Sequence, residues 1–542
     1  MAYLFKMKHL YILFIFTPIF VCSQPWHHDY AFPAWTYHLP SSIVVDYDKG
    51  FILSAVVYNF TPNFEQRNLN YKIDDNGNVI YEFTLGTGPD QNSYFEFPSL
   101  SSQGELIMAG GTFQPSVGEN PMIVLLDSCR QKVWCTSLLN NITGPDFFIE
   151  GFMLADKSII ALSLQNDIDS FKPLFLHKFS SEGQPIWRKE IASMTNHPLI
   201  WNPMPSKLLL LSDGGYLVTG ECYWPNPNDP YGAKYLRMFM VKADSSGNEE
   251  WLYVHGINDY VYSSAHTSVE YNGNIYTDGR LFSSGVGYPT PHFFKTSLNG
   301  THLFDTSIVF PDYNNRRLKN SSILSQNVNG YFFSALKMYP FDEYSNDARP
   351  AMAKIDTMGT VQEFFMYDTV PPLKFIGLPF PTKDDKIIVA GGKLTSNPDI
   401  TDVFASRLTT DTLTLDSIAW TSYSYDSLCP EIESHTISLD NCLIVVSNDD
   451  FKPPIKQYSL KMTPAPVPAV NNLQILYENT LLFRNITVRC YNIMGDELTA
   501  FNVNSGITES NLNVEEWPQG MYFAVAYSDN VKIGCCKIIV TK

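Results

Sequence analysis

The side chains of this chain that could bind a ligand are aromatic rings set beside amides and carboxylates. Six of these rings fall in four long segments rich in Asn, Asp and Pro: Trp201, Trp224, Tyr231, Tyr288, Tyr339 and Phe341. Flat rings beside such groups suit the faces and hydroxyls of sugars, and they also anchor protein interfaces. We therefore expect a binding site for a glycan or, as a second choice, a protein. The alternative is that the rings only pack these segments against one another.

Side chains spaced for catalysis are not evident in the sequence. There is no Gly-x-Ser-x-Gly and no His-Glu-x-x-His motif, so we assign no catalytic residue. Distant parts of the fold could still bring carboxylates together, so an enzyme acting on extracellular polymers remains an alternative. A structural or adhesion protein is a third possibility. Converging carboxylates would favour the enzyme, and an aromatic shelf without them would favour binding.

The repeated polar turns could suggest calcium, but they lack enough ligands. Residues 74–78 (DDNGN) carry several oxygen ligands, whereas their copies at residues 180–183 and 297–300 lack the full set that a calcium loop needs. Calcium needs six to eight converging oxygens, while Gly and Asn in such turns simply tolerate positive φ. A Cys-x2-Cys pair, typical of zinc sites, is also absent. We therefore expect no metal and no cofactor.

Composition excludes some partners. The formal net charge is -18, so no basic surface is available to displace counterions from nucleic acid. Runs of basic residues are absent as well, which argues against anionic lipid as a partner. Hydrophobic residues make up 44% of the chain, enough for a large core.

The elements that must position the six rings come from an internal repeat. An apolar strand follows a turn residue at positions 50, 104, 157, 215, 273, 330, 385 and 441. A bulky ring follows a second turn at Tyr81, Trp134, Trp187, Trp251, Phe304, Phe364 and Trp420. A period near 55 with short strands and Gly, Asn and Asp turns predicts an all-β fold, a β-propeller with one four-stranded blade per repeat. The rings after the second turn are expected to pack between blades.

The number of blades depends on the two ends of the repeat region, residues 24–463. The last repeat offers three strands, the third over residues 454–460, and lacks a fourth. Residues 32–39, with Trp35 in the place of the recurring ring, could supply it and protect an open edge. We therefore predict eight blades, with seven as the alternative. In a propeller the connections between second and third strands and those between blades share one face, which would gather the six rings there.

The N-terminus has the features of a signal peptide over residues 1–23. Lys6, Lys8 and His9 precede an apolar run over residues 10–21, and small residues precede a cut between Ser23 and Gln24. The run is shorter than the roughly 20 residues that span a bilayer, and no later segment is long and apolar enough. An acylated Cys22 is the alternative.

Eight cysteines remain after this cut, at positions 129, 135, 222, 429, 442, 490, 535 and 536. Export permits pairing. Cys129 and Cys135 flank one predicted hairpin, and Cys429 and Cys442 could staple another. Alternatively, several are buried free thiols.

The C-terminal region, residues 471–542, follows a proline-rich linker at residues 464–470 and is expected to form a small β-sandwich. Three of its segments are distinctive: residues 488–498 (VRCYNIMGDEL), 512–523 (LNVEEWPQGMYF) and 537–542 (KIIVTK). In this order, at the C-terminus, they resemble a type IX (Por) secretion system C-terminal sorting domain. The resemblance implies the type IX secretion machinery as a partner, and delivery to the outer-membrane surface or the extracellular space.

Overall fold

The fold is taken from a computed structural model, which divides into an N-terminal unit, Met1–Phe451, and a C-terminal unit, Lys452–Lys542. Within the residues that it describes there are strands and turns but no α-helix, which confirms the all-β prediction. The described residues are 26–30, 37–46, 50–59, 65–87, 92–95, 98–114, 118–138, 147–164, 173–194, 196–225, 234–256, 262–282, 290–309, 317–318, 323–326, 330–339, 349–366, 375–381, 387–394, 401–408, 432–445, 460–478, 485–493, 495–504, 507–528 and 531–542.

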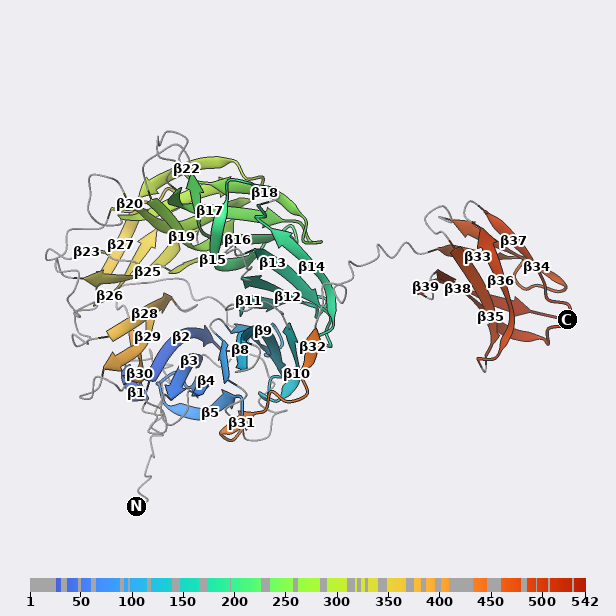
Figure 1. Cartoon of the computed structure of the whole chain (residues 1–542), viewed down its shortest axis with the longest axis horizontal. Coiled ribbons are helices and arrows are strands. Elements are labelled where there is room, and N and C mark those ends of the chain that lie inside the picture. Colours follow the sequence, from blue (N-terminus) through green and yellow to red (C-terminus); the bar gives the residue numbers. More distant parts are fainter. Residues whose placement is uncertain are drawn as a thin grey trace, which may run out of the picture. The chain divides into compact units, whose positions relative to one another are not determined.

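The described part of the N-terminal unit forms seven sheets, numbered here in chain order (Figure 1). The first four contain β2 (Tyr37–Val45), β3 (Phe51–Asn59), β4 (Glu65–Ile73) and β5 (Val79–Leu85); β6 (Asn92–Phe95), β7 (Ser99–Leu100), β8 (Leu106–Gln114), β9 (Gly118–Leu126) and β10 (Lys132–Leu138); β11 (Phe147–Met153), β12 (Ile159–Leu164), β13 (Leu174–Phe179) and β14 (Pro185–Ile191); and β15 (Trp201–Leu210), β16 (Tyr216–Pro225), β17 (Lys234–Ala243) and β18 (Glu249–Val254).

The remaining three sheets follow the same antiparallel plan. They contain β19 (Tyr262–Tyr271), β20 (Asn274–Phe282), β21 (Thr290–Ser297) and β22 (His302–Ser307); β23 (Arg317–Leu318), β24 (Ile323–Gln326), β25 (Phe332–Tyr339), β26 (Arg349–Ile355) and β27 (Val361–Met366); and β28 (Phe375–Pro381), β29 (Ile387–Leu394), β30 (Thr401–Leu408) and β1 (Trp26–Tyr30).

The sheets succeed one another around the unit and pack face to face (Figure 1). The first strand of each sheet packs against the sheet before it, and β2 of the first sheet packs against β29 and β30 of the seventh. Strands between two neighbouring sheets are buried along most of their length, as in β12, whose six residues IIALSL are all buried. Burial on both sides removes the alternation expected of a strand with one wet face.

The eight apolar strands predicted from the repeat all exist, and each begins at or within one residue of its expected start: β3, β8, β12, β16, β20, β25, β29 and β32 (Leu443–Val445). The first seven are the second strands of their sheets. The eighth, β32, instead pairs in parallel with the outer strand β10 of the second sheet. Just before it, β31 (His435–Ile437) pairs in parallel with β5 of the first sheet. The last repeat therefore extends two existing sheets, and the described residues do not confirm an eighth sheet.

The N-terminal strand joins the seventh sheet rather than an eighth. β1 pairs antiparallel with β30, with Asp29 opposite Phe404. The segment predicted for this role, residues 32–39, lies partly outside the described residues, as does Trp35. Its last three residues belong to β2, the first strand of the first sheet. An N-terminal strand does complete the last sheet, but the strand and the sheet both differ from the prediction.

Recurring tryptophans pack between successive sheets, as expected. A Cβ placed on Gly183 would lie 2.5 Å from Trp134, and one on Gly247 would lie 2.5 Å from Trp187. Gly300 meets Trp251 in the same way, at 2.7 Å. These glycines also have φ between 76° and 85°, so both the backbone and the adjacent ring require glycine. Trp420 lies outside the described residues.

One disulfide fixes the last repeat. Cys135 in β10 is bonded to Cys442, 307 residues later and directly before β32. The expected hairpin staples, Cys129 with Cys135 and Cys429 with Cys442, are therefore both wrong, because the pairing of β32 with β10 places Cys442 beside Cys135. Cys129 is also disulfide-bonded. Cys222, Cys490 and Cys536 are buried free thiols, and Cys535 is an exposed one.

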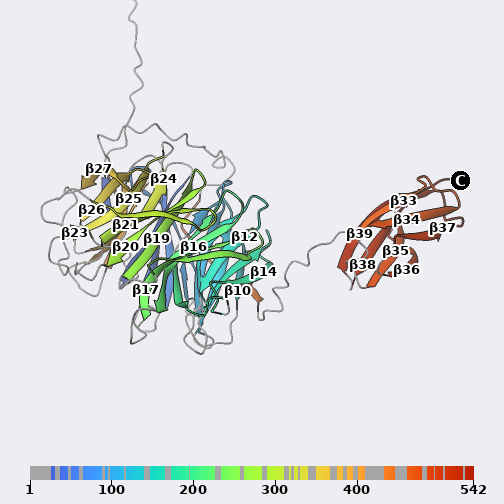
Figure 2. The same ribbon diagram turned by 90° about the horizontal axis from the view of Figure 1, so that it is seen from above.

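The C-terminal unit has two sheets around one core (Figure 2). One contains β33 (Lys461–Ala465), β34 (Asn472–Glu478) and β37 (Glu509–Asn513); the other contains β36 (Glu497–Asn504), β35 (Asn485–Asn492), β38 (Gly520–Ser528) and β39 (Val531–Val540). Leu473 and Ile475 from the first sheet pack with Val488 and Ile538 from the second. The segment expected to be a linker, residues 464–470, begins inside β33, which pairs with β34.

Candidate functional site

Exposed aromatic side chains gather where the fourth and fifth sheets meet, at the start of their innermost strands. Trp201 is the first residue of β15 and Tyr262 the first of β19, and they are 37% and 43% exposed. Tyr223, directly opposite Trp201 in the register of β15 and β16, is also exposed. We call Trp201, Tyr223, Lys234, Tyr235 and Tyr262 the aromatic patch.

Lys234 and Tyr235 connect the two sides of the aromatic patch. The ammonium nitrogen of Lys234 lies 3.3 Å from the centroid of the Trp201 ring, a close cation–π contact. The next residue, Tyr235, places its ring 5.4 Å from that of Tyr262 on the neighbouring sheet. Tyr262 also meets Phe282 edge to face, with ring centroids 6.5 Å apart. The two contacts are made by consecutive residues of β17, and together they involve rings from two neighbouring sheets.

The six rings selected from the sequence lie in different environments, and three of them are outside the described residues. Trp201 belongs to the aromatic patch. Trp224 lies within β16, not in a loop, and its half-buried ring packs on the core shared by the third and fourth sheets. For Trp224 the packing alternative is therefore the better description. Tyr339 ends β25 and pairs with Arg317 in register, whereas Tyr231, Tyr288 and Phe341 lie outside the described residues.

Sequence reasoning missed Tyr223, Lys234 and Tyr262. Tyr262 could have been predicted, because, like Trp201, it directly follows the segment that connects two successive sheets. No signal existed for Lys234, whose importance depends on its reach across the intervening strand β16 to Trp201.

A carboxylate and a guanidinium lie between the same two sheets. Glu221 of β16 and Arg280 of β20 are 3.9 Å apart at their nearest atoms. Burial raises the pKa of Glu221 above its ordinary value, and Arg280 partly opposes this. Burial likewise lowers the pKa of Arg280. His266 of β19 is half-buried, and its pKa falls to about 4 because of desolvation and the Arg280 charge.

Three histidines surround one aspartate farther out between these sheets. His292 Nε2 lies 2.7 Å and His302 Nε2 lies 2.9 Å from the two carboxylate oxygens of Asp305. His255, which follows β18, accepts or donates a 3.0 Å hydrogen bond with the Tyr253 hydroxyl. Although burial raises the pKa of Asp305, the hydrogen bond from His292 and nearby histidine charges lower it overall. Among the described residues, no group of His, Cys, Asp or Glu has the arrangement to hold a metal ion.

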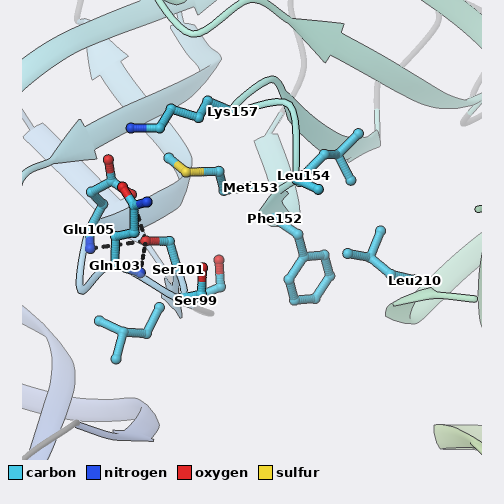
Figure 3. A pocket seen from close by; sticks show the side chains of 12 residues that line it. Ser99, Ser101, Gln103, Glu105, Phe152, Met153, Leu154, Lys157 and Leu210 are labelled. Carbon is cyan, nitrogen blue, oxygen red and sulfur yellow. Dashed lines mark hydrogen bonds between the residues drawn. The ribbon is translucent and has the colours of Figure 1, made fainter. Parts of the chain in front are cut away.

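A cavity of about 400 Å³ opens at the turns that join the first and second strands of neighbouring sheets (Figure 3). It is lined by Ser99, Leu100, Ser101, Ser102, Gln103, Glu105, Phe152, Met153, Leu154, Ala155, Lys157 and Leu210. These residues come from the second, third and fourth sheets. Glu105 is the only carboxylate among them, so the lining lacks the carboxylate pair that most glycoside hydrolases use.

Residues 465–541 match the family described as the secretion system C-terminal sorting domain. The match confirms the type IX sorting domain at the C-terminus, and such a domain directs a protein to the cell surface or extracellular space through the secretion machinery. None of the curated proteins matches this chain. In the described residues, no helix has the length and apolar character needed to cross a membrane.

Several solved structures resemble the chain at low identity. A polysaccharide lyase is 12% identical with a TM-score of 0.45, covering 71% of this chain and 92% of the lyase. An apocarotenoid oxygenase of Synechocystis is 10% identical with a TM-score of 0.36, covering 64% of this chain and 94% of the oxygenase. A GH32 β-fructofuranosidase of Bombyx mori is 9% identical with a TM-score of 0.29, covering 72% of this chain and 86% of that enzyme. At these scores none of their activities extends to this chain.

Proposed function

We propose that this protein is a secreted or surface-exposed seven-bladed β-propeller that binds an extracellular glycan through its aromatic patch. Seven sheets of four to six strands that contact in sequence, with β2 against β29 and β30, support the propeller. The C-terminal sorting domain supports the location. We further propose that residues 1–23, outside the described part, are a signal peptide removed between Ser23 and Gln24.

The observation that carries the binding proposal is the exposure of Trp201 and Tyr262 on rigid strands of adjacent sheets. Their rings are only partly buried, and strands fix them before any ligand arrives, so little ordering entropy opposes binding. A sugar ring can stack on such a face, while the ammonium of Lys234 and the carboxylate of Glu221 are polar groups that hydroxyls can reach. Tyr231, Tyr288, Tyr339 and Phe341 remain candidates for extending this site.

The test is a glycan array followed by titration of any hit with wild type, Trp201→Ala and Tyr262→Ala. Losing one stacking ring is expected to weaken binding about tenfold, equivalent to about 1.4 kcal/mol. Leu303→Ala, which removes an equally exposed apolar side chain from β22, is the matched control and should bind as wild type. Each variant is first shown to melt like wild type.

Three outcomes would contradict the proposal. Wild type could bind no glycan, Trp201→Ala could bind unchanged, or Leu303→Ala could bind as weakly as Trp201→Ala. Capture of a host or bacterial surface protein by the same patch would favour the protein alternative. New reducing ends in a bound polysaccharide would favour the enzyme.

A further inference from the structure

The cavity at the turns has a lysine in a backbone position that favours glycine. Three neighbouring sheets use the same four-residue turn, in which the fourth N–H donates to the first carbonyl: Gly104 to Ser101, Lys157 to Leu154 and Gly214 to Leu211. The fourth residues have φ of 84°, 62° and 83°. A side chain in this left-handed region costs about 1–2 kcal/mol, which glycine avoids. The third sheet alone of these three places a long cationic side chain there.

A second cationic residue with a positive φ shows how buried contacts can offset the cost of this backbone conformation. Arg130 occupies the fourth place of another turn, with φ of 62°. Its guanidinium is buried, lies 3.2 Å from Asp46 and donates to the carbonyl of Gly104 at 2.7 Å. Arg130 therefore holds two sheets together. Lys157 has no such role, since its side chain is exposed and meets no ion-pair or hydrogen-bond partner in the described part of the chain.

On the polar side of the cavity, some side chains are held by hydrogen bonds and others are available to a ligand. The hydroxyl of Ser101 donates to the Glu105 carboxylate at 2.6 Å and accepts from the backbone N–H of Gln103 at 3.1 Å. These bonds fix the direction of Glu105. The side chains of Ser102 and Gln103 make no hydrogen bond within the described residues, so their donors and acceptors are available. Figure 3 shows Lys157 reaching across the opening toward this side.

The other side of the cavity is apolar and mostly aliphatic. Phe152, Met153 and Leu154 of the third sheet, Leu210 of the fourth and Leu100 of the second also line the cavity. Phe152 lies beside Leu210, whereas Met153 points toward Lys157 (Figure 3). One aromatic ring among four aliphatic or thioether side chains suits a branched apolar group better than the flat face of a sugar.

We propose that this cavity binds the carboxyl end of a peptide whose last residue is apolar. The Lys157 ammonium pairs with the terminal carboxylate, and Glu105 accepts the last amide N–H. Gln103 and Ser102 hydrogen-bond the preceding carbonyl, and the last side chain lies against Phe152 and Leu210. This site is on the turn side of the sheets and shares no residue with the aromatic patch.

N-acetyl-leucine is the simplest probe, and isothermal titration of the full-length protein is the measurement. N-acetyl-leucinamide, which lacks the carboxylate, should bind at least about tenfold more weakly. Lys157→Asn should lose binding to the same extent, because asparagine accepts the left-handed φ and carries no charge. Lys157→Arg should retain binding, and Asn272→Gly, which changes a left-handed turn residue away from the cavity, should leave it unchanged.

These experiments test the cavity at the turns and not the aromatic patch. Equal affinity for the acid and the amide, unchanged affinity in Lys157→Asn, or no binding of N-acetyl-leucine would overturn the proposal. Tighter binding of galacturonate than of N-acetyl-leucine would do so as well, since an acidic sugar would then be the better ligand. Trp201→Ala should bind N-acetyl-leucine as wild type, so failure at the aromatic patch and failure here are distinguishable.

Discussion

The indole N–H of Trp26 donates a 2.8 Å hydrogen bond to the backbone carbonyl of Asp75, and this bond joins the seventh sheet to the first. Two interior junctions repeat it, from Trp134 to Ser181 at 2.8 Å and from Trp251 to Leu298 at 3.0 Å. In all three the acceptor lies two residues before the glycine under the ring. The junction made by the N-terminal strand is therefore chemically the same as those within the continuous chain.

Replacing Trp26 by alanine should lower the free energy of unfolding by about 3 kcal/mol, toward the low end for large aromatic rings because Trp26 is only partly buried. Urea unfolding monitored by circular dichroism measures the change. Trp251→Ala, at an interior junction, is the matched variant and should lose a similar amount. A wild-type midpoint for Trp26→Ala would show that β1 does not secure the seventh sheet.

The sequence pattern located strands well but could not assign all their partners. The segment around Leu443 has the same signature as seven other strands, and it is a strand, yet it pairs with β10. Periodicity reports which residues are buried, not which edge a strand joins. β1, with the sequence WHHDY, has only weak strand character, and its place depends on pairing with Phe404 and packing over Gly77. Such contacts across hundreds of residues are invisible to local patterns.

Removing the disulfide by Cys442→Ser should reduce the free energy of unfolding by about 2–5 kcal/mol. The bond closes a loop of 307 residues and fixes β32 on β10, so both chain entropy and the outer strand are affected. Thermal melts with and without a reducing agent give the comparison. Cys535→Ser, which changes an exposed free thiol, should melt as wild type. Equal sensitivity of wild type and Cys442→Ser to the reductant would contradict this account.

Stability should fall as the pH drops below about 6.5, the ordinary pKa of histidine. Burial lowers the pKa of His177 and His292 in the folded protein, and that of His266 to about 4. Below pH 6.5 the unfolded chain therefore binds protons at these histidines that the folded chain does not bind. Each histidine lowers the free energy of unfolding by about 1 kcal/mol per pH unit until its folded pKa is reached. Melting temperatures measured across this range should fall with acidification, and less steeply in His292→Gln. Parallel curves for the two proteins would exclude a contribution from His292.

Deleting residues 465–542 should leave the N-terminal unit folded but retained in the periplasm. The deleted part contains the whole match to the sorting domain, and its hydrophobic core is separate from those of the seven sheets. Cell fractionation with an antibody against the N-terminal unit locates the product. Normal surface delivery of the shortened protein would contradict a sorting role for this domain.

The binding site was predicted only in part, because the sequence does not show which rings the strands leave exposed. Trp201 and Trp224 are both tryptophans at the ends of adjacent strands, but the first is 37% exposed and the second packs on a core. Alternate residues of a strand point to opposite faces, so the one-residue difference between Tyr223 and Trp224 decides which ring is accessible. The cavity at the turns was not predicted, because its lining comes from three sheets and from a lysine whose unusual backbone conformation the sequence does not reveal.

The position of β1 also sets an order of events during synthesis and export. His27 lies beside Ser406, 379 residues later, so the strand made first waits for one made near the end. Loop closure over such a length is slow, and until then the seventh sheet has an unpaired edge that favours aggregation. A chain that stops before residue 401 lacks the partner of β1 altogether. Completion of the last sheet thereby distinguishes a full-length N-terminal unit from a truncated one.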